Sequence, residues 1–225
     1  MQLKYVSIII ALLIPIITTA QSGYGIRAGL NFADYNPNYE IDSMGTEEAA
    51  TKHLGSQAGV FYTISGGGLF SMQPEFNFSQ KGIRYTDAGN LLAKRTLNYL
   101  EFNFLGQTRI INSESVKTYI QLGPGVSYLV SGNDRVQTGN GILKEKIDFD
   151  AANLQRLDLS IHAAFGAAFR IGFENALFIE ARYSLGLSDL NDIPEGQQPD
   201  GYESVNNRVL SVCIGYIYYL DGFSD

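Results

Sequence analysis

The chain has 225 residues, of which 16 are basic and 23 acidic, so its formal net charge at pH 7 is −7. A nucleic-acid-binding protein needs clusters of Lys and Arg against the phosphates, and the acidic balance argues against that class of partner. Tyr and Phe are abundant, Pro is scarce, and the one cysteine, Cys213, has no partner for an internal disulfide, so we expect a β-sheet fold without covalent cross-links.

The first 20 residues have the pattern of a secretory signal peptide. One positive charge, Lys4, precedes an apolar run over residues 6–17, and small residues ending at Ala20 form a cleavage site. The run is shorter than the roughly 20 apolar residues of a transmembrane helix, and no later segment is long and apolar enough to span as one. We therefore predict a signal peptide over 1–20 and a single mature domain over 21–225, in preference to a retained anchor helix.

Eight segments of the mature chain alternate apolar and polar residues one for one, which is the period of a β-strand. They span residues 24–32, 57–64, 70–79, 99–104, 121–130, 157–171, 177–186 and 210–218. An even number of long strands suits antiparallel closure. We therefore predict an all-β fold, an eight-stranded antiparallel up-and-down transmembrane β-barrel.

The composition of the polar face decides which side of the barrel points inward. It consists of Gly, Ser, Ala and Asn with scattered charges, rather than the Lys, Glu and Thr of a solvated surface. The interior of an eight-stranded barrel is just wide enough for side chains to fill, so small residues and paired charges fit there. Bulky residues such as Phe76 and Phe102 fit a face in contact with lipid. The pattern favours a barrel in the cell outer membrane over a soluble barrel with an apolar interior.

The connections between these segments are alternately short and long. The short ones are residues 65–68, 112–115 and 172–175, and the long ones are 33–52, 86–95, 132–155 and 188–205. Long loops of bacterial barrels are extracellular, so we expect both chain ends on the periplasmic side. Gly139-Asn140-Gly141, inside the third long connection, predicts a turn at the tip of a protruding hairpin.

Four strand patterns resemble a known family. They are QPEFNFSQKG at 73–82, YLEFNF at 99–104, LGPGVSYL at 122–129 and IEARYSLGLSDL at 179–190. Together they resemble the PorT-like outer-membrane barrels of Bacteroidota, and the similarity covers essentially all of the mature chain. The resemblance implies an eight-stranded, porin-like barrel. One branch of that family assists protein secretion, but no residue here marks that branch.

Five charged residues fall on the polar face of the predicted strands, which makes them the candidate site residues. They are Arg27, Glu75, Glu101, Glu180 and Arg182. Buried charges are costly unless they are paired, so we interpret them as a structural charge network across a filled lumen. The alternative is a path for protons or small ions along the carboxylates.

His162 raises the question of hydrolysis, because Ser160 and Asp158 lie on the same face of one strand. Neighbours on one face of a strand are about 7 Å apart, which is not the geometry of a catalytic triad. We interpret His162 as packing in the lumen, and we predict no catalytic residue and no enzymatic activity.

The longest predicted loops are acidic. Residues 34–52 hold five acidic residues and one Lys, and residues 188–205 hold five acidic residues and no base. Their spacing matches no calcium-binding loop, so we predict a solvated surface and neither a metal site nor a cofactor. The alternative is a surface that collects the divalent cations which bridge lipopolysaccharide.

These patterns predict a non-enzymatic outer-membrane barrel with a side-chain-filled lumen. Its long loops bind a partner, or its body supports the envelope. The expected partners are membrane lipid, lipopolysaccharide and an extracellular or envelope protein, and not nucleic acid. The alternative function is a narrow porin-like channel for small solutes or ions.

Overall fold

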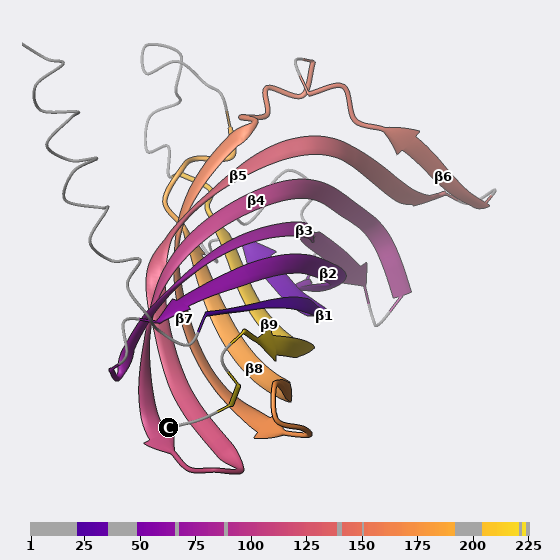
Figure 1. The fold of residues 1–225 in the computed structure, drawn as a ribbon. Helices are drawn as coiled ribbons and strands as arrows, with labels where there is room; N and C mark the ends of the chain where they lie inside the picture. Colours follow the sequence, from indigo (N-terminus) through magenta and orange to yellow (C-terminus); the bar gives the residue numbers. More distant parts are fainter. Residues whose placement is uncertain are drawn as a thin grey trace, which may run out of the picture.

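The computed structural model describes residues 22–35, 49–65, 68–87, 90–138, 141–149, 151–191, 204–220 and 222–223. The predicted signal peptide over 1–20 lies outside these residues. No helix in the described part of the chain is long and apolar enough to cross a membrane. Figure 1 shows the strands of this region, which are β1 (Gly23–Tyr35), β2 (Ala49–Ser65), β3 (Phe70–Asp87), β4 (Asn90–Asn112), β5 (Val116–Thr138), β6 (Gly141–Lys146), β7 (Leu157–Arg170), β8 (Asn175–Gly186) and β9 (Asn207–Tyr219).

Eight of these strands close into a barrel through antiparallel pairs. They follow the order β4-β3-β2-β1-β9-β8-β7-β5, and a β4–β5 ladder joins the two ends. The β1–β9 ladder, from Gly23 opposite Tyr219 to Tyr35 opposite Asn207, joins the first of these strands to the last. β6 lies outside this ring and pairs with β5. The prediction of an eight-stranded antiparallel up-and-down barrel is confirmed.

The barrel is apolar outside and polar inside. Ile26, Leu122 and Ile214 point outward, and each exposes more than 60% of its surface, from 61% to 65%. Inward-pointing Asn31 and Ser127 are fully buried. Soluble proteins bury the opposite set of residues, and such a large exposed apolar face is typical of contact with lipid. The predicted orientation of the two faces is therefore confirmed.

The apolar surface has the height of a membrane band. On β8 the outward apolar positions run from Leu177 to Leu185, which at the usual rise and tilt of barrel strands spans about 20 Å along the barrel axis. At one edge of the band Tyr62, Tyr24 and Tyr218 lie directly opposite one another on β2, β1 and β9. Rows of aromatic residues mark the interfaces of membrane barrels, so this row marks one boundary of the membrane-spanning part.

The two ends of the barrel differ in their connections. The short turns after β2, β4 and β7 lie at one end, which we call the turn end, together with the start of β1 and the end of β9. The opposite end, the loop end, holds the connections that were predicted to be long. One of these predictions is wrong: the loop expected over 86–95 is mostly strand, since β3 continues to Asp87 and β4 starts at Asn90.

β4 and β5 also continue beyond their predicted bounds, and each has 23 residues. The physical reason is that these extensions carry apolar residues on both faces, with Leu97 and Leu105 buried inside and Ile110 exposed outside, so the one-for-one alternation disappears. β5 and β6 pair from Asn133 opposite Lys146 to Thr138 opposite Gly141. They form the predicted protruding hairpin, which extends away from the barrel in Figure 1; residues 139 and 140 lie outside the described part of the chain.

Aromatic side chains fill the lumen at the turn end. The Phe61 and Phe178 rings lie 5.6 Å apart, edge to face, and each covers a glycine of a neighbouring strand, Gly25 and Gly215 respectively. A Cβ atom on Gly215 would lie 2.3 Å from the Phe178 ring, so only glycine allows this close approach. Phe223 follows the last strand and turns back into this cluster, where its exposed fraction is 2%.

Candidate functional site

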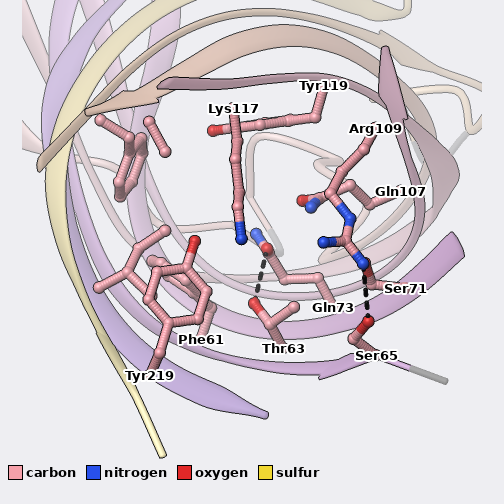
Figure 2. A pocket seen from close by; sticks show the side chains of 13 residues that line it. Phe61, Thr63, Ser65, Ser71, Gln73, Gln107, Arg109, Lys117, Tyr119 and Tyr219 are labelled. Atoms are coloured by element: carbon pink, nitrogen blue, oxygen red, sulfur yellow. Dashed lines mark hydrogen bonds between the residues drawn. The ribbon is translucent and has the colours of Figure 1, made fainter. Parts of the chain in front are cut away.

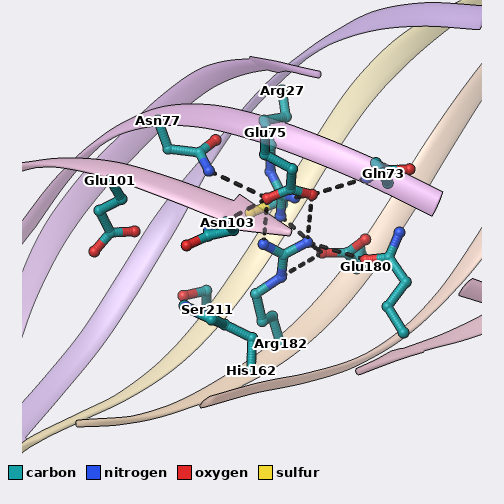
Figure 3. Close-up of polar contacts among 12 residues, drawn as sticks. Arg27, Gln73, Glu75, Asn77, Glu101, Asn103, His162, Glu180, Arg182 and Ser211 are labelled. Carbon is teal, nitrogen blue, oxygen red and sulfur yellow. Dashed lines mark hydrogen bonds and ion pairs between the residues drawn. The ribbon is translucent and has the colours of Figure 1, made fainter. Parts of the chain in front are cut away.

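Four buried charged side chains form a ring of ion pairs in the middle of the lumen (Figure 3). Arg27 on β1 donates to Glu75 Oε1 on β3 at 2.9 Å and to Glu180 Oε1 on β8 at 2.7 Å. Arg182 on β8 donates to Glu75 Oε2 at 2.5 Å and to Glu180 Oε1 at 3.0 Å. The ring holds two positive and two negative charges, so it is neutral as a unit. Its members come from three strands, and the ring therefore bridges the lumen.

Arg27 reaches two strands that are not its neighbours because glycine lies on both sides of it. It is opposite Gly59 on β2 and opposite Gly215 on β9. Neither position has a side chain, so the guanidinium passes over both strands to Glu75 on β3 and Glu180 on β8. A Cβ on Gly59 would lie 2.0 Å from the Asn77 amide oxygen, which shows how closely the lumen is packed there. The local sequence thus positions the ring.

Amide and hydroxyl groups add further hydrogen bonds to the carboxylates of the ring, whereas Arg27 Nε is buried without a hydrogen-bond partner among the described residues. Gln73, Asn77 and Asn103 donate to Glu75 at 2.8, 3.1 and 3.4 Å. The Tyr119 hydroxyl donates to Glu180 Oε2 at 3.2 Å. Buried charges are tolerated when they are both paired and hydrogen-bonded, and both conditions are met here. The ring is therefore a buried, charge-paired cluster that crosses the lumen.

Glu101, the fifth candidate residue, does not join the ring but belongs to a second cluster toward the loop end. Lys81 forms an ion pair with Glu101 Oε1 at 2.8 Å and donates to Asp158 Oδ2 at 3.3 Å. Asn207 also donates to Asp158 Oδ2, at 2.9 Å. Sequence reasoning overlooked Lys81, although it continues the inward-pointing series that contains Glu75 and Asn77 on β3. The alternation along β3, which places every second residue inward, could have identified Lys81 as a lumen residue.

His162 is buried between two hydroxyl groups rather than in a triad. Its Nε2 lies 2.9 Å from Ser160 Oγ and its Nδ1 lies 2.7 Å from Ser184 Oγ. Asp158 accepts from Lys81 and Asn207 and has no hydrogen bond to the imidazole among the described contacts. A nucleophilic triad requires an acid that orients the histidine, and a serine occupies that position here. The interpretation of His162 as a packed lumen residue agrees with this geometry.

A small pocket lies in the lumen at the turn end, and both polar and aromatic side chains line it (Figure 2). Lys117 points into it and lies over the Phe223 ring, 4.2 Å from the centroid. Arg109 donates to Ser65 Oγ at 3.3 Å, and Thr63 donates to Gln73 Oε1 at 3.1 Å. Sequence reasoning did not single out Lys117, although it shares the inward parity of Tyr119. A second, smaller pocket is lined by Lys81, Glu101 and His162 among others, on the other side of the ring.

The remaining candidates from the sequence contribute no chemistry in the described part of the chain. Cys213 is buried and accepts a hydrogen bond from Gln57 Nε2, so it is a packed strand residue. No group of three or more His, Cys, Asp or Glu side chains among the described residues is placed to hold a metal ion. The central parts of the two acidic loops, 36–48 and 192–203, lie outside those residues.

Comparison with known proteins identifies the fold. A family model described as an outer membrane protein beta-barrel domain matches residues 19–192. No curated protein sequence matches the chain. The outer membrane protein OprG of Pseudomonas aeruginosa is similar in structure, with a TM-score of 0.50, 12% sequence identity, and coverage of 89% of this chain and 96% of OprG.

Two further solved structures are similar at a lower level. Ail, the attachment invasion locus protein of Yersinia pestis, has a TM-score of 0.42 and 15% identity, with 88% of this chain and 100% of Ail covered. The outer membrane protease OmpT of Escherichia coli has a TM-score of 0.43 and 9% identity, with 91% of this chain and 100% of OmpT covered. At such identities, a likeness to solved structures concerns the fold alone.

Proposed function

This chain belongs to the family of outer membrane protein β-barrel domains, and on that premise we propose that it is a non-enzymatic barrel with a closed lumen. In this proposal the loop end faces the outside of the cell, where the loops bind a partner or the body supports the envelope. The protein is located in the outer membrane, since its family consists of outer-membrane barrel domains and its apolar band faces lipid.

The observation that carries this proposal is the neutral ring that bridges the lumen. All four of its charges are paired within hydrogen-bond distance, and their side chains expose at most 3% of their surface. A permeant ion would have to break these pairs, each of which is buried away from solvent. Because breaking a buried pair costs about 3–5 kcal/mol, the ring is a barrier rather than a path.

A narrow channel is the second candidate function, and the presence of a pocket on each side of the ring favours it. One lies on the turn-end side of the ring and the other on the loop-end side, so that the ring is the constriction between them. In this alternative, movement of Arg27 or Arg182 would join the pockets into a path for small ions.

Single-channel recording in planar bilayers separates the two functions. We expect the wild-type barrel to give no conductance steps above background. The double variant Glu180→Ser/Arg182→Ser removes one charge of each sign, leaves Arg27 paired with Glu75, and serves as the positive control for an opened lumen. Regular steps from the wild-type barrel would refute the closed lumen and favour the channel.

Loop replacement tests the binding role. Short turns in place of residues 36–48 and 192–203 leave all described strands intact. We expect a pull-down from intact envelopes to lose the partner captured by the wild-type barrel, while the conductance stays at background. Capture of the same partner by the loop-replaced barrel would show that these two loops do not bind it.

We also propose that residues 1–20 are a signal peptide, and the start of the family match at residue 19 supports this boundary. The strand patterns at 73–82 and 99–104 support a finer assignment to PorT-like barrels of Bacteroidota. Mass spectrometry of the protein from outer membranes tests the cleavage, since a mature N-terminus at Gln21 is expected. Detection of the intact leader in the mature protein would contradict it.

A further inference from the structure

Basic side chains form a row across four strands at the loop end. Arg84 on β3 is directly opposite Lys94 on β4, Lys94 is opposite Arg135 on β5, and Arg135 is opposite Lys144 on β6. We call these four residues the basic row. They lie on the extensions of β3, β4 and β5 and on the protruding hairpin, beyond the apolar band.

The basic row lies on the outer face of these strands, the face that contacts lipid lower down. Along β4, Lys94 shares the parity of Leu100 and Phe102, which point outward and are exposed. Between the apolar band and the basic row, a chain of hydrogen-bonded polar side chains on the outer face crosses β2, β3, β4 and β5. Ser56 Oγ donates to Gln80 Oε1 at 2.8 Å, Gln80 Nε2 to Asn98 Oδ1 at 3.0 Å, and Asn98 Nδ2 to Ser131 Oγ at 2.8 Å. This polar ladder marks the loop-end boundary of the membrane-spanning part.

Three of the four charges of the basic row are unbalanced among the described residues. Like charges directly opposite each other on a sheet destabilise it. Lys94, Arg135 and Lys144 form no ion pair with a carboxylate in the part of the chain that the structure describes. Burial lowers the pKa of Lys94, and the neighbouring positive charges of Arg135 and Arg84 lower this pKa further. A net positive row in a protein whose formal charge is −7 indicates an anionic ligand.

The height of the row above the apolar band restricts the ligand. Lys94 lies four residues beyond the ladder residue Asn98 on β4, a distance of about 13 Å along the strand and about 9 Å along the barrel axis. The headgroup layer of a phospholipid bilayer is only about 5–8 Å thick on each side. Phospholipid phosphates therefore lie below the row, whereas anionic groups on the sugar part of a larger glycolipid reach it. The outward direction of the side chains also favours a lateral lipid neighbour over a soluble molecule above the barrel.

We propose that the basic row binds phosphate groups on the sugar portion of an outer-leaflet lipopolysaccharide. The inference rests on the proposed function, since it requires the loop end to face the outer leaflet. Binding of phosphate offsets the repulsion between Lys94 and Arg135 and anchors the hairpin beside the lipid headgroups.

Lipopolysaccharide binding to the full mature barrel in phosphatidylcholine nanodiscs tests the proposal. The triple variant Lys94→Gln/Arg135→Gln/Lys144→Gln removes three charges at similar side-chain length. We expect the affinity of this variant for lipopolysaccharide to fall by about tenfold or more, because each basic residue near an anionic surface contributes about fivefold to binding. Lipopolysaccharide from which the phosphates have been removed should bind the wild-type barrel as weakly as the variant binds the intact glycolipid.

A matched pair of single variants distinguishes specific binding by the basic row from a general effect of positive charge at the loop end. Arg135→Gln and Arg156→Gln each remove one exposed arginine at the loop end, but only Arg135 belongs to the row. We expect weaker binding from the first alone. Unchanged binding by the triple variant, an equal loss in Arg156→Gln, or equal binding of phosphatidylglycerol and lipopolysaccharide would each overturn the proposal.

Conductance and circular dichroism of the same samples keep this test distinct from that of the proposed function. If the barrel is folded and closed but binds phosphatidylglycerol and lipopolysaccharide equally, only the proposed binding by the basic row is refuted. A conducting wild-type barrel refutes the closed lumen and leaves the lipid measurement valid.

Discussion

Replacement of Glu75 by glutamine tests the charge ring most directly. Glu75 accepts hydrogen bonds from Arg27 at 2.9 Å and from Arg182 at 2.5 and 2.8 Å, and its side chain is fully buried. Glu75→Gln keeps the shape of the side chain but leaves two buried guanidinium groups with one carboxylate, Glu180. Removing one partner of a buried ion pair costs about 3–5 kcal/mol. We therefore expect the free energy of unfolding to fall by about this amount.

The double variant Arg27→Gln/Glu75→Gln restores the balance of charge in the ring. It leaves Arg182 paired with Glu180 at 2.9 Å. The double variant should therefore lose less free energy of unfolding than the two single variants lose in sum. The difference should be about 1–3 kcal/mol, as expected for residues of one network.

Urea unfolding of the barrel in lipid vesicles measures these differences, with tyrosine fluorescence as the signal because the chain has no tryptophan. The midpoint for Glu75→Gln should fall by more than about 1 M. The control Glu114→Gln makes the same chemical change at an exposed turn. Its free energy of unfolding should stay within about 0.5 kcal/mol of the wild-type value. A Glu75→Gln barrel as stable as this control, or strictly additive single losses, would refute the reasoning.

Three further predictions concern the rest of the lumen. Lys81→Met leaves Glu101 and Asp158 without their shared cation and should cost about 3–5 kcal/mol in the same unfolding assay; a loss below about 1 kcal/mol would show that these carboxylates are solvated or protonated. Gly215→Ala places a Cβ 2.3 Å from both the Ile26 carbonyl oxygen and the Phe178 ring, and should cost about 1–3 kcal/mol, whereas Gly68→Ala, with no atom within 4 Å, should be neutral. Hydrolysis of a phospholipid substrate should be at background for wild type and unchanged in His162→Gln, and turnover by the wild type that the variant loses would contradict the non-enzymatic proposal.

Much of the barrel could be predicted from the sequence because a strand has a period of two. Apolar residues such as Ile26 and Phe102 alternate with polar ones, so one face of each strand is assigned without knowledge of its neighbours. The same rule assigned Arg27, Glu75, Glu101, Glu180 and Arg182 to the inward face. It failed at the extensions of β4 and β5, because there apolar residues such as Leu97 and Ile110 lie on opposite faces of the strand and the alternation carries no signal.

The number of barrel strands, their inner and outer faces, and the set of side chains that share the lumen follow from the alternation in the sequence. The tertiary structure decided which of those side chains meet. Glu101 pairs with Lys81, Asp158 accepts hydrogen bonds from Lys81 and Asn207, and the basic row forms across four strands. The physical reason is that alternation is a property of one strand, whereas contacts across the lumen and along a row depend on the register of several strands, which barrel closure sets.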